Sequence, residues 1–497
     1  MWSIFWIYFS LGIRKKKNGL YGSMERRSEN LENDYQKSTE TGEETMLPTS
    51  GNTEPAGSVA EVRDMLELND KGNVKNTIGN CLTVFQYDPV LSHAVRYNLL
   101  TERVDVGKPL WWVKNSPALT DTDICYFMYY LEKNYGLTSE KNIQKAIRLT
   151  ADQNRYHPVR DYLNSLCWDG KERISHALSH FLGAEESGYC REALRLFMLG
   201  AIRRVFEPGC KFEVMLCLVG GQGAGKSTFF RLLAAKDDWF TDDLKKLDDD
   251  NVYRKLQGHW IIEMSEMLAT ANAKSIEEIK SFLSRSKEVY KVPYDTHPAD
   301  RMRQCVFGGT SNTIDFLPLD RTGNRRFLPV MVEPDKAEVH ILADEAGSRE
   351  YIGQMWAEAM NIYRRGDYSL SFSPAMQDYL KEYQAVFMPE DTKAGMIQEF
   401  LDDFKGNMVC SKQLYKEALN HAFEEPKQWE IREINDIMNH SVSGWQAFKN
   451  PRRFPGYGRQ KGWERATGTD NLLGNGTEGF TELTEEEARQ MELVFEK

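Results

Sequence analysis

The sequence predicts an α/β protein with a buried parallel sheet at its centre, an α-rich module before the sheet and a smaller helix-and-hairpin unit after it. Three observations support this fold. Before the Pro208-Gly209 break the patterns are mainly helical, whereas after it short apolar runs alternate with helices, starting with Val214 to Val219. Such runs are typical of strands covered on both faces. The third is length, because 497 residues with 41% hydrophobic content suffice for several domains.

Residues 1–65 combine an apolar start with a polar leader. Met1 to Leu11 is apolar but shorter than the ~20 residues that a membrane helix needs, and its basic residues follow the apolar run instead of preceding it. We therefore expect no stable membrane association, and Met24 is an alternative start. Residues from 24 to about 65 have few apolar side chains and predict a disordered leader.

Residues 66–207 predict the α-rich module. Leu82 to Tyr87 alternates between apolar and polar residues and predicts a strand. Capping residues at Thr120 begin a helix that stops near Gly136. Further helices are predicted over Ser139 to Thr150, Pro158 to Leu166 and Tyr189 to Phe206.

Composition limits the classes of function. The net charge of -11 does not exclude nucleic-acid binding, because phosphate contacts depend on local basic patches. The eight cysteines are scattered, and none stands in a CxxC pair or near a histidine at zinc-ligand spacing. This pattern favours a reducing, cytoplasmic location and no zinc site.

A glycine-rich segment follows the first predicted strand and matches GxxxxGK[ST], and the apolar helix Phe229 to Ala235 comes directly after it. That context is the one a P-loop requires, so a chance glycine-rich turn is disfavoured. Backbone N–H groups would surround the phosphates, the lysine would reach the β and γ oxygens, and the serine would bind Mg²⁺. We predict a P-loop NTPase core over residues 208–335 that uses ATP and Mg²⁺, with binding residues Gly220, Gly221, Gln222, Gly223, Ala224, Gly225, Lys226, Ser227 and Thr228.

Two later segments supply polar groups for this site. Glu263 and Glu266 are three residues apart and would point to opposite faces of a continued strand. We therefore predict that the strand ends at Glu263, which would bind the metal, and that Glu266 follows a turn as the catalytic base; alternatively, Glu266 is only a solvated charge. The strand Gln304 to Gly309 leads to Asn312, which would orient attacking water or, alternatively, form a turn.

Arg325 and Arg326 stand immediately before another apolar strand. An arginine can stabilise charge on the transferring phosphoryl group, an effect of ~10³–10⁵ in rate. The alternative is a structural ion pair that holds the turn.

Two further regions mix cations with aromatic residues. Residues 286–303 contain Lys287, Lys291, Arg301, Arg303, Tyr290 and Tyr294, which predict either contacts to phosphates and bases or a solvated hairpin. After a helical linker, 336–390, residues 391–470 predict a winged-helix-like DNA-binding unit from three short helices and a hairpin, Trp445 to Trp463; an acidic tail, 471–497, follows. Against one acid, Glu464, the hairpin carries Lys449, Arg452, Arg453, Arg459, Lys461 and Arg465. The alternative is a solvated hairpin or one that contacts another subunit.

Taken together, these residues resemble the virulence-associated E family, phage and genomic-island P-loop proteins whose ATPase domain is similar to that of superfamily III helicases and phage primase-helicases. The resemblance rests on the P-loop and on Tyr156 to Tyr162, Trp168 to Gly170, Trp260 to Glu263, Val292 to Tyr294, Thr310 to Asn312 and Gly323 to Phe327. It implies DNA replication for a mobile element, ATP with Mg²⁺ and a ring of identical subunits. One departure is that superfamily III helicases usually place their two acids side by side, whereas Met264 and Ser265 separate them here.

The leading hypothesis is therefore an ATP-dependent helicase or translocase that acts on single-stranded or forked DNA. A DNA-bound initiator or switch that does not unwind DNA is an alternative, and a P-loop kinase is another, which the C-terminal unit disfavours. The N-terminal module has neither zinc-ligand cysteines nor an evident acidic metal cluster. Priming would therefore need a separate protein.

Overall fold

The computed structural model describes residues 57–244, 247, 252–265, 273–290, 299–319 and 324–466. The chain divides into two compact units, the first containing residues up to 97 and 103–155, the second containing 98–102 and 156 onward. The predicted acidic tail and the part of the predicted leader up to residue 56 lie outside the described residues. The predicted end of the leader near residue 65 is wrong, because Val59–Asp64 form a capped helix whose Val62 is buried in the core of the first unit. Within the described ranges, no helix has both the length and the apolar character needed to cross a bilayer.

The first unit packs its helices around a core that includes Phe85, Phe127 and Leu131. The predicted strand at 82–87 is wrong, because these residues belong to a helix whose first turn is capped by the Thr77 side chain. Buried residues recur at helical spacing, as in Cys81, Val84 and Phe85, and this burial outweighs the local alternation. The elements are α2 (Val59–Asp64), α3 (Ile78–Tyr87), β1 (Val95–Asn98), β2 (Arg103–Val106), α4 (Asp121–Tyr135) and α5 (Glu140–Gln153), followed by β3 (Arg155–Tyr156).

The second unit is built on a five-stranded sheet with the order β10-β4-β9-β6-β5. Every neighbouring pair is parallel, which confirms the predicted parallel sheet of an α/β fold. The strands are β4 (Met215–Val219), β5 (Phe240–Thr241), β6 (Ile261–Ser265), β9 (Val306–Ser311) and β10 (Phe327–Met331). An antiparallel hairpin, β7 (Lys287–Tyr290) and β8 (Ala299–Met302), lies outside this sheet.

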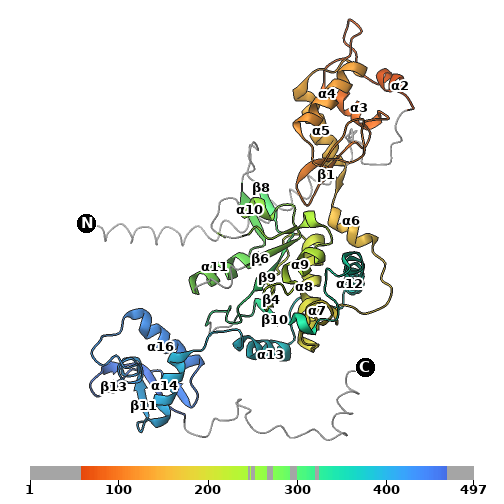
Figure 1. Ribbon diagram of the computed structural model, residues 1–497. Coiled ribbons are helices and arrows are strands. Elements are labelled where there is room, and N and C mark those ends of the chain that lie inside the picture. Colours follow the sequence, from red (N-terminus) through yellow and green to blue (C-terminus); the bar gives the residue numbers. More distant parts are fainter. Residues whose placement is uncertain are drawn as a thin grey trace, which may run out of the picture. The chain divides into compact units, whose positions relative to one another are not determined.

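Helices cover both faces of the sheet, and the strand residues alternate between the two layers (Figure 1). Leu216 and Leu218 of β4 join the core on one face, whereas Cys217 and Val219 join the core on the other. The first face packs against α6 (Pro158–Ser165), α7 (Ala177–Leu182), α8 (Gly188–Phe206), α9 (Lys226–Leu233) and α12 (Glu345–Arg365). The second packs against α10 (Val252–Leu256) and α11 (Ala273–Leu283).

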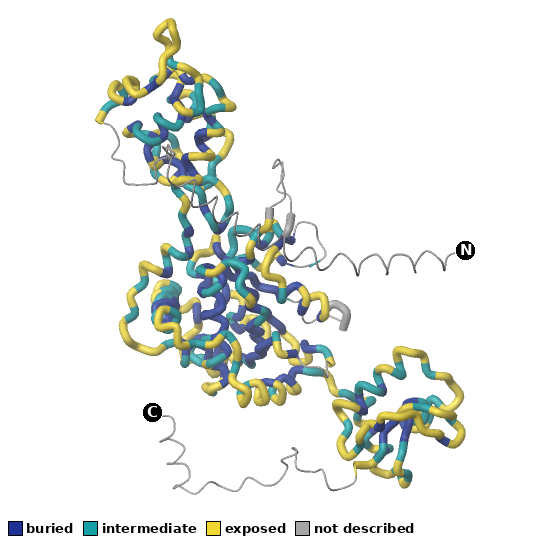
Figure 2. The backbone as a smooth tube through the Cα atoms, turned by 180° about the vertical axis from the view of Figure 1, so that it is seen from behind, coloured by how far each residue is buried: buried dark blue, intermediate teal, exposed yellow. Residues whose placement is uncertain are grey.

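Two predicted module limits differ from this packing. The α-rich module is predicted to extend to residue 207, but α6, α7 and α8 pack on the sheet and belong to the second unit. Residues 336–390 are predicted as a helical linker, and they do contain helices, α12 and α13 (Pro374–Ala385), after η2 (Pro334–Lys336), but α12 packs on the sheet as part of its core. Trp356 of α12 is fully buried, and its ring centroid lies 4.3 Å from that of Trp260. Figure 2 shows this buried core around the sheet. A short helix, η1 (Asp237–Trp239), precedes β5.

Residues 391–466 enclose a separate apolar cluster that includes Leu401, Leu414 and Trp463. Helical segments and strands occur where the sequence predicts three helices and a hairpin: α14 (Thr392–Asp403), β11 (Met408–Cys410), α15 (Ser411–Gln413) continuing into η3 (Leu414–Ala418), α16 (Gln428–His440), β12 (Trp445–Ala447), β13 (Arg452–Phe454), β14 (Gly458–Gln460) and β15 (Gly462–Arg465). The strands form an antiparallel sheet, β11-β15-β12, and a separate ribbon, β13-β14.

Candidate functional site

The glycine-rich loop, residues 220–228, follows β4, which lies between β10 and β9 in the sheet, and its last three residues form the first turn of α9. All five residues of β4 are buried, so the strand fixes the position at which the loop begins. Gly223 and Gly225 have φ values of +81° and +78°, a conformation that is easily adopted only by glycine. Gly225 immediately precedes the first helical residue, Lys226. The loop therefore ends at a helix N-terminus, where unpaired backbone N–H groups attract anions.

The Lys226 amine contacts the backbone of this loop. Its Nζ donates to the carbonyl oxygens of Gly220 and Gly221 at 2.6 and 2.7 Å, and to Oδ1 of Asn312 at 3.0 Å. Asn312 directly follows β9, which pairs with β4. Lys226 is only 6% exposed, and burial lowers the pKa of its amine, while nearby Glu263 opposes that shift. The structure thus brings the predicted lysine and asparagine together.

Glu263 lies on the other side of the loop and is fully buried. Its Oε1 accepts hydrogen bonds from Ser227 Oγ at 2.7 Å and from Thr310 Oγ1 at 2.6 Å. Its Oε2 is buried and has no hydrogen-bond partner among the described residues. Burial raises the pKa of Glu263, although the two hydroxyl donors partly counteract this. A buried carboxylate with one unused oxygen is suited to bind a hard cation.

The predicted strand end at Glu263 is wrong. β6 continues to Ser265, and Glu263 is its third residue, facing Gly308 across the ladder. The side chain reaches Ser227 across β9, which separates β6 from β4 and has Gly308, with no side chain, at the position that pairs with Glu263. Glu266, the predicted base, lies outside the described residues.

Thr310 is a site residue that sequence reasoning did not assign. Thr310 is on β9, two positions before Asn312, which follows the strand. Its hydroxyl donates to Glu263 Oε1, the oxygen that also accepts from Ser227. The spacing of Thr310 and Asn312 contained a signal, since alternate residues of a strand point to the same side. Recognising it required knowing that β9 lies between β4 and β6.

Arg325 and Arg326 lie at the opposite end of the sheet. They precede β10, whose first residue, Phe327, pairs with Met215, the first residue of β4, whereas the glycine-rich loop follows the last. With five residues in β4 and ~3.3 Å per residue, the two ends are separated by ~16 Å. Both guanidinium groups contact Glu213, Arg325 at 3.4 Å and Arg326 at 3.2 Å. The structure does not bring either arginine to the loop of its own chain.

The predicted nucleic-acid segment 286–303 is largely a set of internal ion pairs where it is described. Lys287 pairs with Asp300 at 2.6 Å, and Arg301 pairs with Glu102. Arg303 is 3% exposed and paired with Glu288, so it is a structural residue. Lys291 and Tyr294 lie outside the described residues, and the side chain of Tyr290 is not described. These ion pairs indicate that the described part of this hairpin has a structural role.

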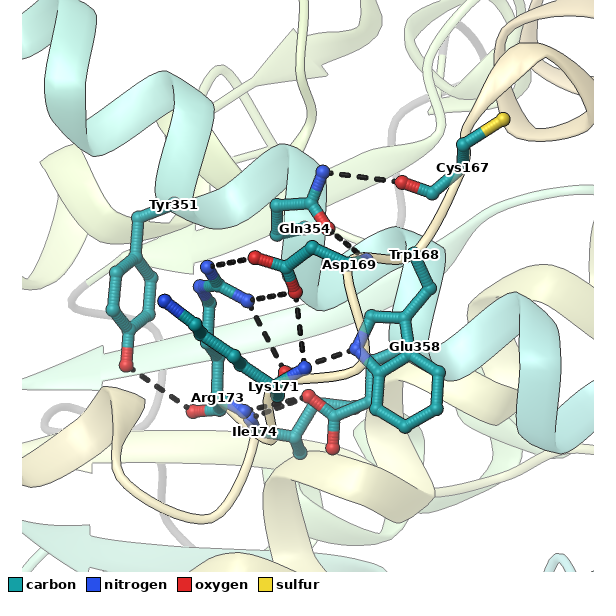
Figure 3. Close-up of polar contacts among 9 residues, drawn as sticks. All are labelled: Cys167, Trp168, Asp169, Lys171, Arg173, Ile174, Tyr351, Gln354 and Glu358. Atoms are coloured by element: carbon teal, nitrogen blue, oxygen red, sulfur yellow. Dashed lines mark hydrogen bonds and ion pairs between the residues drawn. The ribbon is translucent and has the colours of Figure 1, made fainter.

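The Trp168 to Gly170 motif also has a structural role (Figure 3). Asp169 accepts two hydrogen bonds from the Arg173 guanidinium, at 2.7 and 2.6 Å. Glu358 of α12 accepts from the backbone N–H groups of Arg173 and Ile174 at 2.7 and 3.1 Å. The motif therefore holds the connection between α6 and α7 against α12.

In the C-terminal unit, three of the six predicted cations make internal contacts. Arg452 pairs with Glu464 at 2.6 Å, Arg459 donates to the Pro451 carbonyl, and Arg465 donates to backbone carbonyls including that of Leu401. The exposed cations without a partner among the described residues are Lys449, Arg453 and Lys461. The available positive charge is therefore smaller than the sequence count indicates.

Residues 163–389 match the family model of the virulence-associated protein E-like domain. The chain carries a virulence-associated protein E-like domain. This domain includes the whole five-stranded sheet and the cluster around Lys226 and Glu263, and the resemblance inferred from the sequence is confirmed over it. Tyr156 to Tyr162, which contribute to the resemblance, and the C-terminal unit lie outside the matched residues.

Solved structures of the NrS-1 C terminal region are similar to this chain at low identity. The A form apo structure is 13% identical with a TM-score of 0.44, and a second apo structure (305-718) is 12% identical with a TM-score of 0.41. Each alignment covers 75% of this chain and 96% of the other. No curated protein matches the chain.

Proposed function

We propose that this chain is an ATP-dependent DNA helicase or translocase of a phage or mobile genetic element. Its P-loop ATPase site would lie in the virulence-associated protein E-like domain, residues 163–389, called the E-like domain below. The observation that carries the proposal is the convergence of Lys226, Ser227, Glu263 and Asn312 around one glycine-rich loop. Three strands of the sheet, β4, β6 and β9, position these groups, as a P-loop site requires. Replication of the element's DNA in the cytoplasm is the setting we infer.

The residues present fit ATP with Mg²⁺. Ser227 Oγ and the unpartnered Oε2 of Glu263 are hard oxygen ligands on the same side of the loop, and Mg²⁺ prefers such ligands with phosphate oxygens. A bound Mg²⁺ would neutralise charge on the β and γ phosphates. Because burial disfavours the ionised form of Glu263, a cation beside it would relieve the cost of its negative charge.

Lys226 and Asn312 take the other roles in the proposed reaction. The lysine now donates to two loop carbonyls, and we infer that it exchanges them for the β and γ phosphate oxygens when nucleotide binds. Asn312 would then be released from Nζ to orient the attacking water. Glu266 remains the proposed general base, because its position directly follows β6 in the sequence.

Arg325 is the proposed arginine finger, and it would act on a neighbouring subunit. Its side chain is 74% exposed, whereas that of Arg326 is 21% exposed. Both line a hollow of about 550 Å³ to which Lys211 and Lys381 also contribute, against two acids, Glu213 and Asp378. A cationic hollow at the end of the sheet opposite the loop is suited to a neighbour's phosphates. This arrangement supports a ring of identical subunits in head-to-tail contact.

DNA binding is proposed for residues 391–470, a winged-helix-like unit in which the β13-β14 ribbon is the wing. Arg453 and Arg459 lie directly opposite each other on this ribbon, and like charges in such a position repel unless an anion lies between them. Helix α16 carries three acids, Glu430, Glu433 and Asp436. We therefore assign phosphate contact to the ribbon instead of the helix.

The test is ATP hydrolysis by the full chain with and without single-stranded DNA, alongside Lys226→Ala. We expect hydrolysis that DNA stimulates and that the variant lacks. Hydrolysis that DNA stimulates without unwinding or movement along DNA would favour an initiator or switch. Priming would still need a separate protein. Phosphate transfer to a small acceptor in preference to water would overturn the proposal in favour of a kinase.

A further inference from the structure

The first unit presents a cluster of aromatic side chains outside the E-like domain. We call it the aromatic platform and define it by five residues from the β2-α4 connection and from α4: Trp111, Trp112, Tyr126, Tyr129 and Tyr130. Trp111 is 46% exposed and Tyr129 is 58% exposed. Tyr126 and Tyr130 are one helical turn apart, so they share a face of α4. Large aromatic side chains exposed together on one surface indicate a binding site.

The platform is held in place by contacts to one buried carboxylate. Asp123 accepts a hydrogen bond from Trp112 Nε1 at 2.6 Å and is paired with Lys114. Its other bonds are to Thr120 in the capping box that begins α4. The Trp112 and Tyr126 rings are stacked, with centroids 4.8 Å apart and planes within 9°. The Trp112 and Tyr126 rings are therefore fixed before any ligand binds, and Trp111 packs edge-on against Trp112, which reduces the entropic cost of binding.

Positive charge lies beside the rings. The connection 107–118 contains Lys108 and Lys114 and no acidic residue, and it lines a hollow of about 450 Å³. The side chain of Arg96 packs directly on Gly107, where a Cβ atom would lie 2.6 Å from its Cδ. Lys133 lies 5.8 Å from the centroid of the Tyr129 ring. Lys108 of the connection, which lines this hollow together with Trp112, and Lys133 of α4 thus supply positive charge beside the platform, whereas the charge of Lys114 is paired with Asp123.

We propose that the aromatic platform binds single-stranded nucleic acid, with bases stacking on Trp111 and Tyr129 and phosphates next to Lys108. Cations that follow a backbone, combined with exposed aromatic rings, are the features that bind single strands without sequence preference. A purely apolar partner surface would not need the cations, and duplex DNA does not expose its base faces. The site is distinct from the proposed ATPase site and from the β13-β14 ribbon, and its occupancy requires no ATP.

The experiment measures binding of fluorescein-labelled oligo(dT) to the full chain by anisotropy, without nucleotide. The starting protein carries Arg453→Gln and Lys461→Gln, so that the ribbon contributes little. Adding Trp111→Ala with Tyr129→Ala should weaken binding by roughly 5- to 150-fold for each stacked base lost. Trp111→Phe with Tyr129→Phe should restore most of it, since stacking survives. The matched control is Leu149→Ala, an exposed apolar residue on α5 of the same unit, which should change nothing.

Two further readouts separate the possibilities. Lys108→Gln should reduce the slope of log affinity against log salt by ~0.7, and 5-iodouracil placed in the oligonucleotide should cross-link to Trp111 or Tyr129 on irradiation. Equal binding by the alanine and phenylalanine variants, with cross-links only elsewhere, would overturn the proposal. Because nucleotide-free binding is measured, failure of the ATPase proposal would leave these results unaffected. Unchanged basal ATP hydrolysis and thermal unfolding of the alanine variant would show that the chain is folded.

Discussion

The two arginines before β10 occupy different environments and should respond differently to substitution. Arg326 Nε lies 3.2 Å from Glu213 Oε2 and 3.1 Å from Ser284 Oγ. Arg325 reaches Glu213 only at 3.4 Å and is mostly exposed. We expect Arg325→Ala to change the free energy of unfolding by less than ~1 kcal/mol, as for an exposed ion pair. Arg326→Ala should cost about 1–3 kcal/mol, because it removes the less exposed of the two arginines that contact a mostly buried carboxylate, which keeps its hydrogen bond from Ser284.

The stability effect should also depend on pH. Burial alone would raise the pKa of Glu213, but Ser284, Arg326, Lys211 and Arg325 lower it below its usual value of 4.5. A depressed carboxyl pKa stabilises the fold above the unfolded-state pKa, and this contribution is lost as pH falls through the folded-state pKa. Thermal unfolding of Arg326→Ala and the wild type should therefore differ at pH 7, and the difference should shrink as pH falls below 4.5 and through the lower folded-state pKa of Glu213.

The loss of ATPase activity should be larger in Arg325→Ala than in Arg326→Ala, which is the reverse of the order expected for the loss of stability. If Arg325 is the finger, Arg325→Ala should lower the ATPase rate by ~10³-fold or more. Arg325→Lys should be nearly as inactive, because a lysine lacks the planar guanidinium that binds two phosphate oxygens. Arg326→Ala should keep much more activity at a temperature where it is folded. Steady-state hydrolysis measures this, and loss in Arg326→Ala with a normal rate in Arg325→Ala would refute the assignment.

Mixing distinguishes action on a neighbour from action within one chain. Lys226→Ala and Arg325→Ala subunits, each inactive alone, should recover partial ATPase activity together, since some interfaces then join an intact loop to an intact finger. Co-assembled mixtures that never recover activity would show that Arg325 acts within its own chain or only holds the turn.

The remaining predictions concern the loop, the metal and the ribbon. Lys226→Ala should abolish hydrolysis while far-UV circular dichroism stays unchanged, because the lysine contacts only loop carbonyls and Asn312; retained turnover would contradict the site. Glu263→Gln keeps the side-chain shape but loses the charge, so a fluorescent ATP analogue should bind with little dependence on Mg²⁺ in a titration. Removing the charges of Arg453 and Lys461 should weaken DNA binding across sequences. The matched control is removal of the charge of Arg452, which is paired with Glu464. The salt slope should fall by ~0.7–0.9 per lost contact, and equal effects at all three positions would contradict the ribbon assignment.

The sequence predicted the local parts of the site because those parts depend on neighbouring residues. The glycine-rich loop, the strand before it and the helix after it lie within 214–233, and each has its own pattern. Glu263 and Asn312 could be proposed because each stands at or near the end of an apolar run. Their meeting with Ser227 and Lys226 depends on the strand order, which no local pattern specifies.

The errors have the same physical origin. Leu82 to Tyr87 alternates locally, but the burial of Cys81, Val84 and Phe85 in a helical core decides its structure. Arg326 contacts Glu213 more than a hundred positions away, on the segment that leads into β4, so the sequence offered an ion pair only as an alternative and could not name its partner. The number of cations available in the C-terminal unit was likewise predicted too high, because Arg465, on β15, donates hydrogen bonds to backbone carbonyls. Long-range pairing removes charges that a sequence count treats as available.

The most direct test of the central claim is strand separation on a forked DNA duplex, comparing the wild type with Lys226→Ala in the presence of ATP and Mg²⁺. The account predicts that the wild type displaces the labelled strand with ATP but not with a non-hydrolysable analogue, and that the variant displaces none. Equal displacement by both proteins, or hydrolysis by the wild type without any displacement or movement along DNA, would contradict it.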